Sequence, residues 1–247
     1  MKIHQVKTRL VNSYVIEYPD KLLVMDVAVR CHRYVLGFIE TQLQRNILDT
    51  ELVICSHDDP DHMGGVKALA ALTQAKIALP QASGAWFQKL INNPTGQFTR
   101  TRTSMAELFR ARSWAMYLNP ERDRAAKAQP KFKGDPSHDV HGKSHKNITP
   151  NYRLMNDGLL PGFSDWSVIH TPGHSWDSCC FYHAETGSLL TGDTLLGSSQ
   201  TNTLVAPSIY AHRKQTQASL DKLRALDIRA VYPGHGGIIK GTHLIPT

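Results

Sequence analysis

The chain has 247 residues, of which 41% are hydrophobic, 20% charged and 8% aromatic. This composition is that of a globular protein and excludes collagen-like, low-complexity and wholly disordered chains. No apolar run of about 18 residues occurs, so the sequence predicts no membrane-spanning helix and no membrane partner. Its first residues alternate like a strand and lack the apolar core of a secretory signal, and its four cysteines are too few for a disulfide framework. We therefore expect reduced thiols and a cytoplasmic protein.

The net charge of +7 is confined to one segment. The chain has 28 Lys or Arg and 21 Asp or Glu. Residues 99–153 contain 12 of the basic and 5 of the acidic residues, so the rest of the chain has 16 of each and is neutral. A local positive segment attracts anionic substrates, nucleic acid or an acidic partner surface. A solvated arm that only aids solubility is the competing interpretation, and the sequence leaves both open.

The first part of the chain predicts alternating strands and helices. In chain order we expect a strand over 3–18, a turn at 18–21, a strand over 22–28, a helix over 33–48, a strand over 51–55, a helix over 64–72 and a strand over 75–79. Strand, loop and helix in alternation indicate an α/β protein with layers of both kinds.

The middle of the chain interrupts this pattern. A helix is expected over 104–118, but residues 119–150 are rich in Pro, Lys, Gly and His and have no apolar periodicity. Regular patterning then returns, with strands expected at 166–170, 178–183, 188–191 and 230–232 and a helix at 212–226. The sequence thus predicts a single domain over 1–247 that carries a basic, partly flexible insertion at about 99–153.

The loop that follows the predicted strand 51–55 is rich in residue types that bind metals. His57, Asp59, Asp61 and His62 fall within six residues, between a buried strand and the start of a helix. Imidazole and carboxylate groups suit a catalytic divalent metal that keeps open positions for water. The competing interpretation is an Asp-rich helix N-cap with incidental histidines.

Three later strands end in a histidine or aspartate with a neighbouring glycine. These residues are His174, Asp193 and His235. A lone histidine at a strand end is more often structural than a ligand. Three such ends, together with the earlier loop, are hard to explain by capping alone and favour a shared metal site.

Taken in order, these motifs resemble those of the metallo-β-lactamase superfamily, in which a His-x-His-x-Asp-His loop is followed by single His, Asp and His ligands. The resemblance extends from the 11–28 hairpin to His235, with the basic insertion in its middle. It implies an α/β fold, a four-layer αββα sandwich with the metal site along one edge of the paired sheets.

The same resemblance implies seven metal ligands and two divalent ions. One ion would be held by His57, Asp59 and His174, the other by Asp61, His62 and His235, with Asp193 bridging both. Zinc is the first expectation for these ions, with iron or manganese as the alternatives. No other cofactor is implied.

Asp59 departs from the family pattern, which has a histidine at this position. A carboxylate there makes the first site harder and more negative, which suits iron or manganese as well as zinc. The substitution resembles the flavodiiron branch, where a Glu stands at this position and the metals are iron, although this chain has no room for the flavin domain of those proteins. Asp26, at the end of an early strand, is expected to support the metal-binding loop.

The resemblance implies a metallo-hydrolase in which a metal-bound hydroxide attacks an ester, lactone, thioester, amide or phosphodiester bond. Asp61 would orient the nucleophile or pass a proton to the leaving group. The alternatives are an iron-dependent redox enzyme related to the flavodiiron branch, and a binding protein whose site Asp59 has disabled. A small substrate, anionic in view of the basic segment, is expected; nucleic acid is less favoured, and a homodimer is left open.

Overall fold

The computed structural model describes residues 1–8, 11–84, 90–91, 93–110, 148–198 and 201–246. The chain divides into two compact units. The N-terminal unit is formed by Met1–Leu79 and Asn119–Arg153, and the C-terminal unit by Pro80–Leu118 and Leu154–Thr247. Of the insertion predicted at about 99–153, residues 111–147 lie outside the described residues, and so does most of its predicted flexible part.

A six-stranded sheet forms the centre of the N-terminal unit, with its strands in the order β1 to β6. They are β1 (Lys2–Lys7), β2 (Asn12–Glu17), β3 (Leu22–Met25), β4 (Thr50–Ile54), β5 (Lys76–Pro80) and β6 (Tyr152–Leu154). β1, β2 and β3 pair antiparallel, whereas β3, β4 and β5 pair parallel. The register places Met25 beside Ile54, so the residues that follow β3 and β4 leave the sheet at the same edge.

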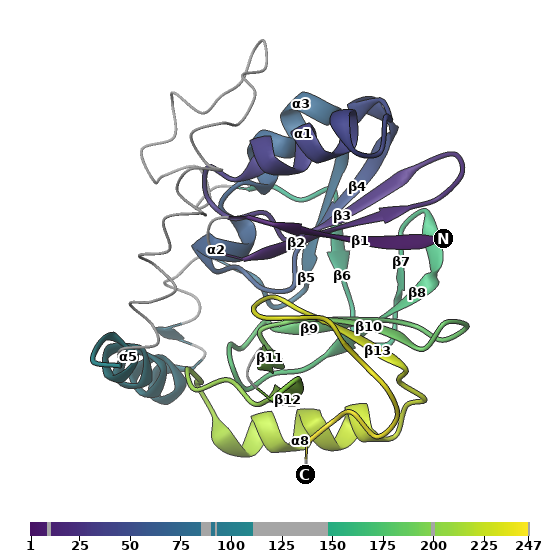
Figure 1. The fold of residues 1–247 in the computed structure, drawn as a ribbon. Helices are drawn as coiled ribbons and strands as arrows, with labels where there is room; N and C mark the ends of the chain where they lie inside the picture. The colour runs from purple at the N-terminus through teal and green to yellow at the C-terminus, as the bar shows by residue number, and fades with distance from the viewer. Residues whose placement is uncertain (9–10, 85–89, 92, 111–147, 199–200, 247) are drawn as a thin grey trace. The chain divides into compact units, whose positions relative to one another are not determined.

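Helices α1 (His32–Thr41) and α3 (Val66–Thr73) lie on one side of this sheet (Figure 1). Their apolar faces join the strands in one buried cluster, which includes Val15, Val24 and Val53 from the sheet, Leu36 and Ile39 from α1, and Leu69 from α3. Burial of these side chains fixes both helices on the sheet, because each removes apolar surface from water. The short α2 (Pro60–Met63) and the 3-10 helix η1 (Ile47–Asp49) complete the helices described in this unit.

The C-terminal unit holds a second six-stranded sheet, in the order β14-β13-β10-β9-β8-β7. Its strands are β7 (Leu159–Leu160), β8 (Phe163–His170), β9 (Cys179–His183), β10 (Ser188–Gly192), β13 (Ala230–Pro233) and β14 (Ile239–Lys240). β10 and β13 pair parallel. β9 is antiparallel to both of its neighbours, β8 and β10, so β8, β10 and β13 all run in the same direction and end at the same edge.

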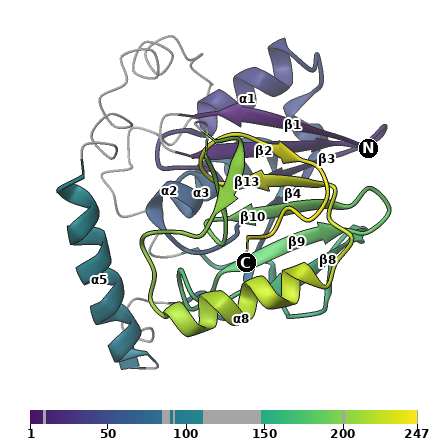
Figure 2. The same cartoon turned by 60° about the horizontal axis from the view of Figure 1, so that its bottom comes forward.

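Two helices and a two-stranded sheet also belong to this unit. Helix α8 (Arg213–Arg224) runs along the strands of the six-stranded sheet (Figure 2) and buries Leu220 and Leu223 in a cluster with Leu189 and Val231. Helix α5 (Pro94–Leu108) belongs to the same unit, and β11 (Leu196–Ser198) pairs with β12 (Thr203–Val205).

Three predicted elements were wrong in their extent. The strand expected over 3–18 is two antiparallel strands, in which Lys7 pairs with Asn12 and the Thr8 hydroxyl donates to the Val11 carbonyl at 2.6 Å. The helix expected over 33–48 ends at Thr41, and Gln44 adopts a left-handed conformation (φ 53°) that an α-helix cannot continue. Of the helix expected over 104–118, residues 104–108 belong to α5, which begins earlier, at Pro94, where Asn93 caps it by accepting from the Gly96 N–H. Residues 111–118 of that prediction lie outside the described residues. The strands and helices expected at 51–55, 64–72, 75–79, 166–170, 178–183, 188–191, 212–226 and 230–232 are confirmed to within a few residues.

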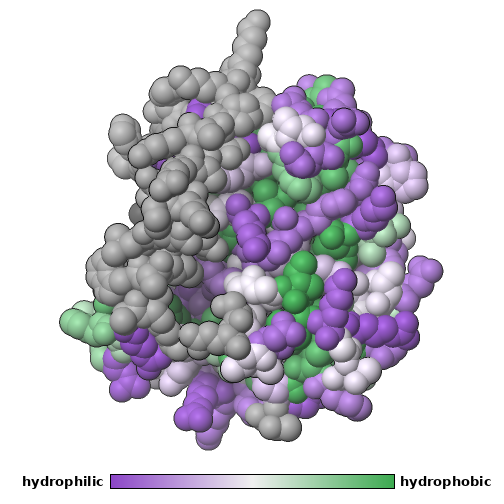
Figure 3. All heavy atoms as spheres, viewed as in Figure 1, coloured by the Kyte–Doolittle hydropathy of each residue, from purple (hydrophilic) through white to green (hydrophobic). Residues whose placement is uncertain are grey.

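Among the described residues, no helix is long and apolar enough to cross a membrane. On the face drawn in Figure 3, hydrophobic side chains form small patches between hydrophilic ones.

All four cysteines lie in the described part of the chain, buried and outside any disulfide. Burial raises the pKa of Cys180 to about 11, and burial also raises the pKa of the neighbouring Cys179. A thiol with a raised pKa carries little thiolate at neutral pH and is a poor nucleophile. Cys31 and Cys55 lie in the apolar cluster of the N-terminal unit, and Cys180 lies in that of the C-terminal unit.

We predict that the native protein reacts very slowly with a thiol reagent such as Ellman's reagent. At pH 8 a thiol whose pKa is about 11 is ionised in about one molecule per thousand, and burial limits access to it as well. Reaction at pH 8 should be about 100-fold slower than in denaturant, where all four thiols should react. Rapid modification of any thiol in the folded protein would contradict this account.

Candidate metal centre

Four of the predicted ligands lie where β4 turns into α2. Ser56 and His57 follow the strand and are buried. Pro60 occupies the first turn of α2, which places Asp59 at the N-cap and Asp61 and His62 in the helix. Proline at this position is favourable because its fixed φ suits a helix start. The turn from a buried strand into a short helix thus places all four side chains within six residues.

The structure separates the two interpretations of this loop. In the described segment 11–84, Asp59 stands at the N-cap position but makes no side-chain capping hydrogen bond with α2. Its Oδ2 instead lies 3.2 Å from Nε2 of His57. The carboxylate therefore faces a histidine and not the helix N-terminus, which favours the metal-ligand interpretation over capping.

Asp26 supports the loop from the neighbouring strand, as predicted. Its carboxylate is buried and accepts hydrogen bonds from the Ser56 backbone N–H at 2.7 Å and from the Ser56 hydroxyl at 2.8 Å. A third contact of 2.8 Å joins Asp26 Oδ2 to Nδ1 of His62. One buried carboxylate thus fixes both the end of β4 and the ring of His62. The parallel register of β3 and β4 is what brings these residues together.

The contact with Asp26 determines which nitrogen of His62 is the ligand atom. A carboxylate accepts the Nδ1 proton, so Nε2 carries the lone pair in the neutral ring. Nε2 lies 3.8 Å from Oδ2 of Asp61, on the same helix. A carboxylate behind a histidine ligand is the arrangement that orients metal-binding imidazoles and raises their basicity.

The remaining three ligands belong to the C-terminal unit and follow the strands that end at one edge of its sheet. His174 comes after β8, Asp193 directly after β10 and His235 shortly after β13. The Nδ1 of His174 lies 2.7 Å from the Ile209 carbonyl oxygen. Because a carbonyl only accepts, Nδ1 carries the proton and Nε2 is again the ligand atom.

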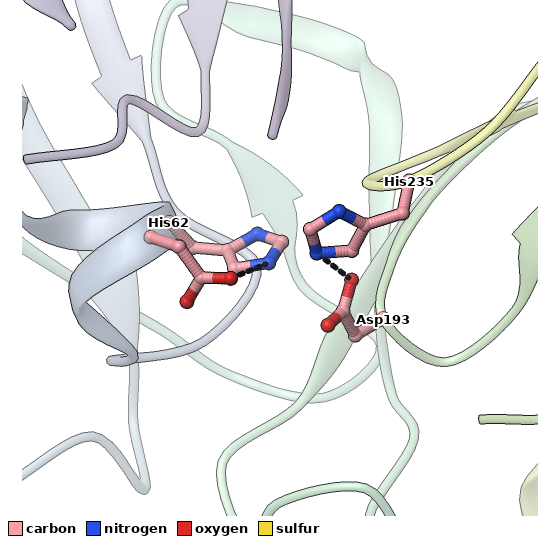
Figure 4. Close-up of side chains that lie close together, drawn as sticks. His62, Asp193 and His235 are labelled. Carbon is pink, nitrogen blue, oxygen red and sulfur yellow. Dashed lines mark ion pairs between the residues drawn. The ribbon is translucent and has the colours of Figure 1, made fainter. Parts of the chain in front are cut away.

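Asp193 lies between the two histidines of this set. Its Oδ2 is 3.7 Å from Nε2 of His174. Its Oδ1 is 3.5 Å from Nε2 of His235, and Figure 4 shows this second pair. Each oxygen of one carboxylate thus faces a different imidazole. This is the arrangement that a carboxylate bridging two cations requires.

The loop that carries His235 is held closely against its neighbours. The Gly197 N–H donates to the His235 carbonyl at 2.9 Å, and the Gly234 N–H donates to the Gly192 carbonyl at 2.8 Å. Gly236 has φ +90°, and a Cβ there would overlap the Gly197 carbonyl oxygen. Only glycine combines this conformation with so close an approach.

These distances fit divalent ions. Two ligands about 2.1 Å from a tetrahedral metal lie about 3.4 Å apart. Within each unit, the separations between a histidine Nε2 and a carboxylate oxygen run from 3.2 to 3.8 Å, longer than most hydrogen bonds but suited to a shared cation. Each of the seven residues belongs to a group of histidine and aspartate side chains that could hold a metal ion.

The structure thus groups the predicted ligands within each unit. It also shows supporting groups that the sequence analysis missed. The Ile209 carbonyl behind His174 is a backbone atom with no sequence signal. Arg100, whose guanidinium contacts His174, was counted only as one charge of the basic segment.

Comparison with known proteins places these observations in a family. The sequence model described as "Metallo-beta-lactamase superfamily" matches residues 6–235, which covers both units. The chain is 37% identical over 110 residues to "Probable metallo-hydrolase YqjP" of Bacillus subtilis (strain 168), covering 38% of this chain and 34% of that protein. It is 38% identical over 93 residues to an atrochrysone carboxyl ACP thioesterase of Aspergillus fumigatus, covering 37% of this chain and 27% of that protein. The chain therefore spans about a third or less of the length of the curated relatives it matches.

Solved structures show the same fold. The metallo-beta-lactamase family protein TTHA1429 from Thermus thermophilus matches with a TM-score of 0.61 and 24% identity, over 96% of this chain and 74% of that one. TTHA1623, solved in a di-iron-bound form, matches with a TM-score of 0.56 and 21% identity, over 97% of this chain and 94% of that one. The predicted fold class, the α/β sandwich of the metallo-β-lactamase type, is confirmed.

We predict that Asp26→Asn lowers metal affinity about 10- to 100-fold, the usual effect of losing a group that supports a histidine ligand. The amide cannot accept from Ser56 and His62 as the carboxylate does. Competition with a chromophoric chelator measures the affinity. Asp165→Asn is the matched control, because Asp165 also contacts a histidine ring (His183 Nε2, 3.1 Å) but belongs to neither ligand set. Equal losses in both variants would contradict a specific role for Asp26.

Gly236→Ala should destabilise the protein by about 1–3 kcal/mol, because the added methyl overlaps a carbonyl oxygen and the backbone has a positive φ. Gly237→Ala is the matched control, since nothing lies within 4 Å of a Cβ at that position. Urea unfolding of the two variants compares their free energies. A stable Gly236→Ala protein would show that the loop near His235 is not closely packed.

Proposed function

Because the chain belongs to the metallo-β-lactamase superfamily, an enzyme superfamily of metallo-hydrolases, we propose that it is a metal-dependent hydrolase in which the two ligand sets hold one pair of divalent ions. The observation that carries the proposal is the position of Asp193, whose two oxygens face His174 and His235. One ion would be held by His57, Asp59 and His174, the other by Asp61, His62 and His235, with Asp193 between them.

Divalent ions at this site would supply an activated water and polarise the bond to be cleaved. The protein's own residues do the positioning. Asp26 and the Ile209 carbonyl fix the rings of His62 and His174, so that these two rings need no reorientation to bind. The Asp61 side chain is about one-third exposed (34%), so its carboxylate can exchange a proton with the leaving group or with solvent.

We favour an ester or thioester as the bond cleaved. Support comes from the names of several relatives, which are atrochrysone carboxyl ACP thioesterases of fungi with 33–38% identity over parts of this chain. The buried thiols of Cys179 and Cys180 have raised pKa values and are unsuited to act as nucleophiles. A water nucleophile fits this chain better than a covalent enzyme intermediate on sulfur.

Zinc is our first choice of metal, and iron is the second. The carboxylate of Asp59 supports iron or manganese at the first ion, because hard oxygen ligands suit these metals. A structural relative that holds two irons gives this alternative a precedent in the fold. Iron-dependent redox chemistry is therefore the second candidate function.

Purification without added metal, followed by elemental analysis and assays on thioester, lactone, β-lactam and phosphodiester substrates, tests the proposal. We expect two zinc ions per chain and turnover of a thioester or ester. A protein that holds two irons, has an oxygen-dependent spectrum and hydrolyses none of these substrates would favour the redox enzyme over the hydrolase.

Asp193→Asn should lower metal content and reduce kcat/KM about 100-fold or more, since even the loss of a group behind a ligand costs about 10- to 100-fold. His243→Ala, at an exposed histidine, is the control and should change neither quantity. Full activity and full metal content in Asp193→Asn would exclude the proposed site.

A further inference from the structure

Helix α5 is anchored to one short segment of the C-terminal unit, residues 209–212. At the start of the helix, Asn93 Oδ1 accepts from His212 Nε2 at 2.7 Å. Ten residues later, the Thr103 hydroxyl lies 3.3 Å from both the carbonyl oxygen and the N–H of Tyr210. Two contacts on one helix fix its position and its rotation relative to that segment.

The same segment holds the predicted ligand His174. The Ile209 carbonyl accepts from its Nδ1 at 2.7 Å, and the Ala211 N–H and the His212 N–H donate to the Gly173 carbonyl at 2.7 and 3.0 Å. Segment 209–212 therefore contacts both α5 and the His174 loop and fixes their relative position. A side chain on the anchored face of α5 keeps a defined position relative to His174.

Arg100 lies on that face, one turn before Thr103. It is half-buried, and its Nη2 lies 3.1 Å from Nε2 of His174. A guanidinium only donates hydrogen bonds, and Nε2 is the acceptor nitrogen of this ring. Arg100 is thus aimed at the lone pair through which His174 would bind a metal ion.

A metal ion and a guanidinium cannot share one lone pair. Once His174 binds a metal, the guanidinium has to release Nε2, and the anchored helix keeps it beside the site. A positive group with five donors then faces the place where substrate would bind. Such a group pairs best with a carboxylate or phosphate, which it binds through two parallel hydrogen bonds.

We propose that Arg100 determines substrate specificity by binding an anionic oxygen group of the substrate, a carboxylate or a phosphate, beside the metal site. The inference rests on the proposed function, because it takes His174 as a metal ligand. It gives one residue of the basic segment a defined role, while exposed positions such as Arg102 on the same helix have no contact of this kind with a ligand.

Two substrates that differ by one charge test the proposal. Mono-4-nitrophenyl succinate carries a carboxylate, and its methyl ester is neutral. Arg100→Gln should lower kcat/KM for the anionic substrate about 10- to 100-fold, mainly through KM, and change the neutral one less than about two-fold. Arg100→Lys should lose less, because it keeps the charge but not the paired hydrogen bonds. Arg102→Gln is the matched control and should leave both substrates unchanged.

Equal losses of kcat/KM for the two substrates would show that Arg100 only supports His174. An unchanged kcat/KM for both substrates would show that Arg100 has no role in the site. Elemental analysis should find at least as much metal in Arg100→Gln as in the unmodified protein, since the guanidinium no longer competes for Nε2. A loss of metal would overturn the proposal.

Calorimetric titration of the metal-loaded protein separates this inference from the proposed function, because it needs no turnover. Succinate and inorganic phosphate serve as the probes. The probe that binds more tightly shows whether Arg100 prefers a carboxylate or a phosphate. We expect binding about 10-fold weaker in Arg100→Gln and unchanged in Arg102→Gln. Failure to cleave either ester would count against these bonds as substrates, whereas equal anion binding in both variants would overturn the role of Arg100.

Discussion

The candidate site depends on the Nδ1 proton of two of its histidines, His62 and His174. In the N-terminal unit the buried Asp26 carboxylate faces Nδ1 of His62, and in the C-terminal unit the Ile209 carbonyl faces Nδ1 of His174. Each oxygen fixes one tautomer and one orientation, so that Nε2 is presented as the ligand. Without these acceptors the proton could lie on either nitrogen of each ring, and Nε2 would not be reserved for a metal ion.

The sheets explain why the ligands gather. In the N-terminal unit, β3 and β4 are parallel neighbours, and Asp26 and Ser56 follow their ends. In the C-terminal unit, β8, β10 and β13 run in the same direction and deliver His174, Asp193 and His235 at one edge. Parallel strands place their carboxyl ends together, which is why sites form there in α/β proteins. Side chains far apart in sequence thereby reach one another within each unit.

Charge gives this member of the superfamily its own character. Asp59 places a carboxylate where the family pattern has a neutral imidazole, and it lies against His57 instead of capping α2. Arg100 places a cation against His174 on the other ligand set. If the proposed function holds, the additional carboxylate would influence which metal the site prefers, and the guanidinium would influence which substrate it prefers.

The sequence alone determined the family, the class of fold and the seven candidate ligands, because metal ligation needs particular residue types at particular strand ends. It also predicted Asp26 as a supporting residue. Periodicity failed where local geometry ended an element. Gln44 stops the helix after Thr41, and the expected first strand divides in two where Thr8 hydrogen-bonds to Val11. The start of α5 was missed because its polar first turns, from Pro94, have no apolar period.

Only the tertiary structure decided which atoms face one another. That Asp193 presents one oxygen to each of two histidines depends on strand register, and that Asp59 faces His57 depends on the turn into α2. Ile209 orients His174 through its backbone carbonyl. Every residue has such a carbonyl, so no sequence pattern could predict this contact. Arg100 and His174 are 74 residues apart in the sequence, and their contact depends on how α5 is anchored. Side-chain periodicity carries no information over that separation.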